Sequence, residues 1–202
     1  MSNRIDVIKE GYSRWLTADT MAANATSVLI RSNDNQMNVV FDTLSPWDRQ
    51  YMIDKLATFG INCDDINALV CSHTHVDHIG NLNLFTKCQH YVGDHVYRED
   101  VYQLTPFQDS HCIQLSRDMQ IVATPGHTMD SISLVVHNVD KLGTVGLCGD
   151  LFECQNDLTD ESIWISAGSQ DVAKQRHHRQ VMLSMCDHIM PGHGSVFKVT
   201  KV

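Results

Sequence analysis

The stretch Val70-Cys-Ser-His-Thr-His-Val-Asp-His-Ile-Gly80 places three histidines and one aspartate within six residues, directly after an apolar run. In an extended backbone, residues i and i+2 point to the same side, so His73 and His75 can reach one metal ion. The chain then turns through Asp77 and His78 into a helix, which can direct these two side chains towards a second ion nearby. Imidazole and carboxylate ligands suit Zn²⁺ and similar borderline cations. A polar loop that is rich in histidine by chance is the alternative, and the density of the cluster speaks against it.

Three further apolar runs repeat this arrangement, because each ends in glycine or Pro-Gly and then a side chain that can bind a metal. Residues 120–124 lead into Pro125-Gly126-His127, residues 144–148 into Gly149-Asp150, and residues 187–190 into Pro191-Gly192-His193. Small residues beside each ligand let the backbone turn sharply and approach a crowded centre. Strand ends gathered on one rim of a sheet are where α/β folds place their chemistry. We therefore expect His127, Asp150 and His193 to join the first cluster.

The secondary structure predicted from these patterns mixes strands and helices. Short runs rich in Val, Ile and Leu predict buried strands at residues 28–30, 38–41, 68–71, 120–123, 132–136 and 144–148. Helical spacing predicts one helix over residues 48–59 and a second over residues 172–186. The apolar residues on the expected inner face of the second helix are Val172, Ala173, Val181, Met182 and Met185. In a chain of 202 residues, this mixture indicates one layered α/β domain over residues 1–202.

Composition narrows the class of protein. The chain has 15 Lys and Arg against 24 Asp and Glu, a formal net charge of −9, which argues against a protein that coats nucleic acid without excluding RNA as a substrate. No apolar run approaches the roughly 18 residues that span a bilayer, and the first residues do not resemble a secretory signal. The seven scattered cysteines predict reduced thiols. We expect a cytoplasmic or nuclear protein that is not secreted and has no membrane partner.

The combined pattern resembles the metallo-β-lactamase superfamily over nearly the whole chain. His73-x-His75-x-Asp77-His78 is followed by His127, Asp150 and His193 in that family's order. The resemblance implies a four-layer αββα sandwich with metal ions at one edge of its two sheets. Asp42, in Val-Val-Phe-Asp-Thr, matches the family's first motif, whose carboxylate supports the metal-binding loop from behind the ligands.

The resemblance also implies how the ligands divide between two metal ions, in a set similar to that of glyoxalase II and ribonuclease Z. Two Zn²⁺ ions per chain are expected, with iron or manganese as alternatives. The first ion would take His73, His75 and His127, the second Asp77, His78 and His193, and Asp150 would bridge them.

A small animal branch of the superfamily resembles this chain more closely. The likeness lies in Ile79-Gly-Asn-Leu-Asn-Leu-Phe85, Gly149-Asp-Leu-Phe-Glu153 and Pro191-Gly-His-Gly-Ser-Val-Phe-Lys-Val199. That branch is associated with endonucleolytic cleavage of RNA, specifically of histone pre-mRNA 3′ ends, and with a homodimeric state. The resemblance therefore implies a metal-dependent phosphodiesterase, an endoribonuclease, with RNA as its partner.

The expected chemistry needs no nucleophilic side chain. Two metal ions about 3.5–4 Å apart share a water and lower its pKa towards 7, which gives a bridging hydroxide at neutral pH. Asp77 can accept a hydrogen bond from that hydroxide and orient it, so Asp77 and Asp150 are the expected catalytic carboxylates. Two dications, two carboxylates and one hydroxide sum to about +1, which attracts anionic groups. No residue is singled out as proton donor to the leaving group.

Other functions use the same ligands and stay open. A glyoxalase II-like hydrolase would act on a thioester or another anionic small molecule, and a mononuclear iron oxygenase would act on persulfides. A non-enzymatic module with a structural metal is a third alternative, against which the complete ligand set counts. The basic cluster at residues 174–179, on the last long helix, could contact RNA phosphates, although a run of charge on a helix is usually a solvated face. The cluster consists of Lys174, Gln175, Arg176, His177, His178 and Arg179.

Overall fold

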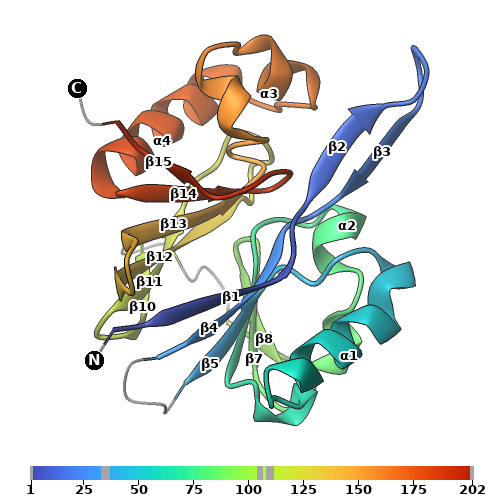
Figure 1. The fold of residues 1–202 in the computed structure, drawn as a ribbon, viewed down its shortest axis with the longest axis vertical. Helices are drawn as coiled ribbons and strands as arrows, with labels where there is room; N and C mark the ends of the chain where they lie inside the picture. Colours follow the sequence, from blue (N-terminus) through green and yellow to red (C-terminus); the bar gives the residue numbers. More distant parts are fainter. Residues whose placement is uncertain (1, 33–36, 104–106, 108–111, 201–202) are drawn as a thin grey trace.

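Two β-sheets lie face to face between outer helices (Figure 1) in a computed structural model that describes residues 2–32, 37–103, 107 and 112–200. The first sheet has the strand order β1-β4-β5-β6-β7-β8-β9 and the second the order β10-β11-β12-β13-β14-β15. The strands of the first sheet are β1 (Arg4–Lys9), β4 (Ser27–Arg31), β5 (Asn38–Phe41), β6 (Ala68–Cys71), β7 (Gln89–Val92), β8 (His95–Arg98) and β9 (Val101–Gln103). Those of the second are β10 (Cys112–Ser116), β11 (Met119–Ala123), β12 (Ile132–Val139), β13 (Gly143–Gly149), β14 (His188–Pro191) and β15 (Phe197–Lys198).

Helices cover the outer face of each sheet, and a separate ribbon extends from the first. The helices α1 (Arg49–Thr58) and α2 (Val76–Ile79) lie on the first sheet, whereas α4 (Val172–Met185) covers the second with α3 (Ser162–Ser166) beside it (Figure 1). Short 3₁₀ helices lie in the connections between these elements, at Pro46–Asp48, Cys63–Asp65, Leu82–Leu84 and Gln155–Leu158. The strands β2 (Tyr12–Trp15) and β3 (Met21–Asn24) pair with each other in a two-stranded antiparallel ribbon that projects away from the first sheet (Figure 1).

Alternating side chains of the strands build three separate cores. In β5, Val39 and Phe41 pack between the two sheets, whereas Val40 packs with the buried residues of α1. In β12, Leu134 packs between the sheets, whereas Val135 packs with Met182 of α4 and its neighbours. Because side chains alternate across a strand, each sheet is apolar on both faces and must be covered twice. The predicted four-layer αββα sandwich is thereby confirmed.

The predicted strands are confirmed, most of them extended by one to three residues. The inner face predicted for α4 is wrong, because Ala173 and Met185 are exposed and only Met182 of the expected set is buried. The buried side chains of α4 are instead Gln175, Arg179 and Met182. Apolar periodicity cannot find this face, since two of its three residues are polar and bind the loop that follows β13, as described below.

The ends of four central strands meet at one edge of the sandwich. The strands β5 and β6 run parallel in the first sheet, as do β13 and β14 in the second. Asp42, Ser72, Asp150 and Gly192 follow directly after these four strands. The carboxyl ends of the two parallel pairs therefore bring together the segments that carry the candidate ligands. Among the described residues, no helix is both long enough and apolar enough to cross a membrane.

Candidate metal centre

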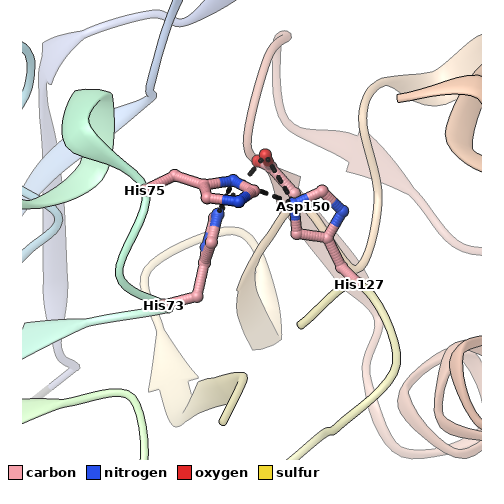
Figure 2. A group of neighbouring side chains, drawn as sticks. All are labelled: His73, His75, His127 and Asp150. Carbon is pink, nitrogen blue, oxygen red and sulfur yellow. Dashed lines mark hydrogen bonds and ion pairs between the residues drawn. The ribbon is translucent and has the colours of Figure 1, made fainter. Parts of the chain in front are cut away.

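Three histidines and one aspartate form a compact group of donor atoms, here called the histidine-rich half (Figure 2). One ligand atom from each of His73, His75, His127 and Asp150 lies within 4.8 Å of the others. His75 Nδ1 is 2.8 Å from His73 Nε2 and 3.2 Å from His127 Nε2. Asp150 Oδ2 is 3.4 Å from His127 Nε2 and 3.7 Å from His73 Nε2. Donors bound tetrahedrally to Zn²⁺ at about 2.0–2.1 Å lie about 3.3 Å apart, so this spacing fits one such ion.

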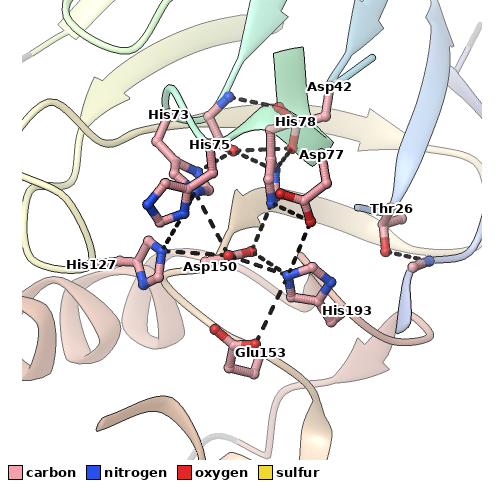
Figure 3. Close-up of polar contacts among 12 residues, drawn as sticks. Thr26, Asp42, His73, His75, Asp77, His78, His127, Asp150, Glu153 and His193 are labelled. Atoms are coloured by element: carbon pink, nitrogen blue, oxygen red, sulfur yellow. Dashed lines mark hydrogen bonds and ion pairs between the residues drawn. The ribbon is translucent and has the colours of Figure 1, made fainter. Parts of the chain in front are cut away.

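A second group, here called the carboxylate-rich half, adjoins the first (Figure 3). Donor atoms of Asp77, His78 and His193 lie within 4.8 Å of one another. The Nε2 atoms of His78 and His193 are both 3.2 Å from Asp150 Oδ1, and Asp77 Oδ2 is 3.8 Å and 3.9 Å from the same two nitrogens. Within the described part of the chain, His78 Nε2 and Asp150 Oδ1 are buried without a hydrogen-bond partner. Buried polar atoms need a partner, and a cation between these donors provides one.

Asp150 belongs to both halves. Its Oδ2 lies on the side of His73 and His127, whereas its Oδ1 lies against His78, and His193 Nε2 is 3.2 Å from each oxygen. A carboxylate that offers one oxygen to each of two donor groups has the placement that a bridging ligand requires. The structure thus brings together all seven residues that the sequence pattern singles out.

Glycines let the two sheets approach each other at Asp150. Gly149 has a φ of 51°, a left-handed conformation that side chains other than glycine rarely adopt, and a Cβ there would collide with Ser72 Oγ. A Cβ on Gly192 would collide with Asp150 Oδ1. The Gly-Asp and Pro-Gly-His sequences are therefore required by close packing around the carboxylate.

Asp42 stands behind the ligands, as expected from its motif, and holds His78. It is fully buried, and its Oδ2 is 2.8 Å from His78 Nδ1. Its Oδ1 accepts a hydrogen bond from the Ser72 backbone N at 2.7 Å, and Ser72 Oγ donates to its Oδ2 at 3.0 Å. A carboxylate on the far nitrogen of an imidazole fixes the ring's tautomer and orientation. Here it leaves His78 Nε2 pointing at Asp150.

His193 is held in the same manner by a backbone group. Its Nδ1 is 3.0 Å from the carbonyl oxygen of Asn24, the last residue of β3. The ribbon thereby fixes the ring while Nε2 faces Asp150. This contact between residues 169 positions apart has no signature in the sequence.

Burial and charge give the imidazoles different protonation states in the metal-free protein. Burial lowers the pKa of His73 well below its usual value and that of His127 to about 4, so both rings are neutral. Burial also opposes the charging of His193, but Asp150 outweighs it and raises the pKa of His193 to about 9. The pKa of Asp150 is well below its usual value because His193 and His78 overcome its burial. A cation that enters the carboxylate-rich half must therefore displace protons.

Sequence reasoning missed a buried acid in this half, Glu153. It is 4% exposed, its Oε2 is 4.0 Å from His193 Nε2, and its Oε1 has no hydrogen-bond partner among the described residues. Ligand atoms of Glu153, Asp150 and His193 lie within 4.8 Å of one another. Burial, and then the nearby Asp150, raise the pKa of Glu153 well above its usual value. Its position three residues after Asp150 is the one available signal, and an isolated glutamate in a loop is too common to be informative.

A pocket of about 230 Å³ opens beside Glu153 and His193. Trp15 and Met21 of the ribbon line it on one side, and Ile163 of α3 lines it on the other. The remaining lining residues are Ser13, Cys154, Ser162, Ser166 and Ala167. The pocket reaches the carboxylate-rich half, so the ribbon and α3 together define a space for part of a substrate.

The cations of the basic cluster are paired with acids of the same domain. Arg176 Nη2 is 2.7 Å from Glu161, and Lys174 Nζ is 3.6 Å from Asp171. The side chains of both pairs are about half exposed. This surface of α4 therefore carries little uncompensated positive charge.

Two members of the cluster instead hold the loop after β13. Gln175 is fully buried, and its Nε2 donates to the backbone oxygen of Asp150 at 2.9 Å. Arg179 donates to the oxygen of Leu151 at 2.8 Å and forms a buried ion pair with Asp157 at 2.7 Å. These contacts explain the polar inner face of α4: it positions the segment that carries Asp150 and Glu153.

Two vertebrate proteins are similar to this chain in sequence. "Metallo-beta-lactamase domain-containing protein 1" of Xenopus laevis is 35% identical over 199 residues, which cover 98% of this chain and 82% of that protein. The protein of the same name in Mus musculus is 37% identical over 165 residues, which cover 81% of this chain. The chain spans only 62% of the mouse protein's length.

Solved structures share the fold at low identity. A Thermotoga maritima protein of the metallo-beta-lactamase type superposes with a TM-score of 0.69 and 16% identity, covering 98% of this chain and all of that one. A dizinc quorum-quenching lactonase superposes with a TM-score of 0.62 and 13% identity, covering 91% of this chain and 81% of that one. The family model described as "Metallo-beta-lactamase superfamily" matches residues 22–193. The sandwich, the metal-ligand cluster and this match agree: the chain belongs to the metallo-β-lactamase superfamily of metal-dependent hydrolases.

Proposed function

We propose that this protein is a dinuclear zinc hydrolase, and the single observation that carries the proposal is the shared position of Asp150. One carboxylate faces imidazole groups on both of its sides, at 3.2–3.7 Å. The histidine-rich half would hold one ion through His73, His75 and His127, and the carboxylate-rich half a second ion through Asp77, His78 and His193.

A pair of bound zinc ions supplies a nucleophile at neutral pH, by lowering the pKa of water, and positive charge that stabilises the transition state. The protein's own residues orient the reactants. Asp77 is partly exposed and reaches the site from α2, so its carboxylate can accept a hydrogen bond from the attacking water and orient that water towards the substrate. Asp42 keeps His78 in one tautomer throughout the reaction.

For the substrate, we propose RNA, cleaved as by an endoribonuclease. His75 is exposed at the edge of the site, so a chain substrate can lie across it. The ribbon carries Trp15, which is 59% exposed and lines the pocket, and on its other face Tyr12, which is 43% exposed, with the Arg14 guanidinium 5.9 Å from the centre of the Tyr12 ring. Aromatic faces combined with arginine are the usual means of binding single-stranded nucleic acid. The resemblance to the RNA-cleaving branch supports the same substrate.

The test combines metal analysis with two substrates, a labelled single-stranded RNA and a glutathione thioester. The proposal expects two zinc ions per chain and metal-dependent RNA cleavage that Asp150→Asn abolishes. Trp15→Ala should weaken RNA cleavage, whereas Trp47→Ala serves as the matched control, because Trp47 is 88% exposed and does not line the pocket. One bound iron ion with neither activity would overturn the hydrolytic mechanism.

A small-molecule hydrolase is the second candidate, and the pocket favours it. A space of about 230 Å³ is smaller than typical ligand pockets of roughly 300–1,000 Å³, which suits a compact acyl group. The net charge of −9 and the paired cations of α4 also give little attraction for a polyanion. Turnover of the thioester with RNA left intact would establish this function and exclude the nuclease.

A further inference from the structure

Glu153 places a third carboxylate at the carboxylate-rich half of the metal centre. Its side chain is 4% exposed, and the Oε1 atom has no hydrogen-bond partner among the described residues. Its Oε2 is 4.0 Å from His193 Nε2 (Figure 3). An unpaired polar atom in such a site costs free energy unless a ligand satisfies it. Within the described part of the chain, Oε1 therefore has no partner, and Oε2 has only the distant His193 ring.

The backbone around Glu153 is fixed. Its own N donates to Asp157 Oδ2 at 2.7 Å, and Asp157 is held in turn by Arg179 at 2.7 Å. Both Asp157 and Arg179 are buried. The glutamate is thus delivered to the site by a rigid loop.

The donor sets of the two halves differ in kind. The histidine-rich half offers three imidazoles and one carboxylate oxygen, the set typical of tetrahedral zinc. In the carboxylate-rich half, Asp77, His78 and His193 form one group of donors, and Asp150, Glu153 and His193 form a second group that shares His193, so two imidazoles meet three carboxylates there. Oxygen-rich sets suit harder ions such as Mn²⁺, which prefer six ligands.

The spacing of the donors differs in the same sense. The separations given above for the histidine-rich half are 2.8–3.7 Å, near the tetrahedral value. In the carboxylate-rich half, Asp150 Oδ1 is 3.2 Å from the Nε2 atoms of His78 and His193, but the separations widen to 3.9 Å between His193 Nε2 and Asp77 Oδ2 and to 4.0 Å between His193 Nε2 and Glu153 Oε2. Opposite ligands of an octahedral ion are about 4.2 Å apart and neighbours about 3 Å apart. The wider half therefore fits an ion with five or six ligands.

We propose that Glu153 is a fifth protein ligand of the carboxylate-rich half, and that Mn²⁺ consequently competes with zinc for this half far better than for the histidine-rich half. The inference rests on the proposed dinuclear centre and names a residue of it that the family's ligand pattern does not include. A third carboxylate would also lower the summed formal charge of two bound dications and their ligands by one unit.

The experiment measures metal binding and does not depend on turnover. Metal-free protein receives one equivalent of zinc and is then titrated with Mn²⁺, whose free and bound forms are distinguished by electron paramagnetic resonance. Wild type is compared with Glu153→Gln, which keeps the size of the side chain and the backbone bond to Asp157. Glu161→Gln is the matched control, because Glu161 is a solvent-exposed glutamate of the same region that pairs with Arg176.

Wild type and Glu161→Gln should bind one Mn²⁺ beside the zinc, and Glu153→Gln should bind it about 10–100-fold more weakly, with zinc affinity unchanged. Glu153→Asp, which keeps the charge but shortens the reach, should fall between them and provides the readout if the glutamine variant does not fold. Equal Mn²⁺ affinity of all folded variants overturns the inference. Protein that binds no divalent ion at all would instead refute the proposed function.

Discussion

The two halves of the metal centre are supported in different ways. In the carboxylate-rich half, the far nitrogen of each imidazole is anchored: His78 Nδ1 lies 2.8 Å from Asp42, and His193 Nδ1 lies 3.0 Å from the Asn24 carbonyl oxygen. In the histidine-rich half only His73 is anchored in this way, with its Nδ1 3.0 Å from Ser72 Oγ, whereas His127 Nδ1 is buried without a hydrogen-bond partner among the described residues and His75 is exposed. The carboxylate-rich half is therefore pre-organised at both imidazoles, whereas His75 and His127 of the other half can adjust.

This difference shows which ligands the fold holds in place before metal binds and which ones the metal must order. Anchored rings bring their tautomer and direction from the fold, so metal binding there costs little rearrangement. Unanchored rings are ordered by the ion itself. We expect substitutions behind the carboxylate-rich half to act at a distance, and those in the histidine-rich half to act only through the ligand removed.

The largest effect should come from the residue that the halves share. Asp150→Asn keeps the size of the side chain but removes the charge and one carboxylate oxygen. We expect metal content to fall from two ions per chain to one or none, and the rate of hydrolysis to fall about a thousandfold, equivalent to roughly 4 kcal/mol. Metal analysis after dialysis checks the first outcome and steady-state kinetics the second. A variant that keeps both ions would show that Asp150 does not join the halves.

Removing one histidine from each half should destabilise the metal-free protein to different extents. His78 and Asp42 are both fully buried, so His78→Ala leaves a buried carboxylate without its imidazole and should lower the free energy of unfolding by about 3–5 kcal/mol. His75→Ala removes an exposed side chain and should change it by less than about 0.5 kcal/mol. Urea denaturation of both variants without metal gives the comparison. Equal losses would mean that the halves are equally anchored.

Removing the anchor while leaving every ligand in place is a sharper test. Asp42→Asn tolerates the φ of 56° found at this position, but it replaces the carboxylate behind His78. We expect affinity in the carboxylate-rich half to fall about 10–100-fold, while the histidine-rich half keeps its ion. Competition with a zinc chelator resolves the two binding steps. Asp54→Asn, at an exposed acid on α1, should leave both steps unchanged.

Much of this architecture could be predicted from sequence because it is periodic or local. The buried strands 38–41 and 68–71 are short apolar runs. Their successive side chains pack in turn into the core between the two sheets and into the core that contains α1. His73 and His75 can be recognised as candidate ligands from their spacing alone. Residues whose importance arises from contacts across the chain are different: Asn24 meets His193 over 169 positions, and no local pattern records that.

The two features that the sequence does not predict, the polar inner face of α4 and the role of Glu153, also depend on contacts between distant residues. The inner face of α4 was expected to be apolar, yet Gln175 and Arg179 lie there because the loop after β13 exposes backbone oxygens that need donors. Glu153 cannot be predicted as a site residue, because its role depends on the His193 ring that the fold places beside it. Polar groups that serve other polar groups cannot be recognised until the fold has placed both.

The support that α4 gives to Asp150 can be tested by a smaller change. Gln175→Ala removes the hydrogen bond to the Asp150 backbone oxygen and leaves that buried carbonyl without this donor. We expect the free energy of unfolding to fall by about 1–3 kcal/mol, with weaker metal binding in both halves. Gln180→Ala, at an exposed position of the same helix, is the control for helix propensity. Loss of affinity in only one half would show that the loop positions Glu153 more than Asp150.

The smallest effect should come from the exposed cations of α4. Lys174 and Arg176 already pair with Asp171 and Glu161, so replacing both by alanine should leave RNA cleavage and its salt dependence unchanged. Arg14→Ala, at an exposed position of the ribbon, should reduce the slope of log rate against log salt by about 1 if Arg14 contacts a phosphate. Measuring both slopes locates the substrate. A reduced slope for the α4 variant alone would move the RNA from the ribbon to the helix, and the pocket beside Glu153 would then lose its place in substrate binding.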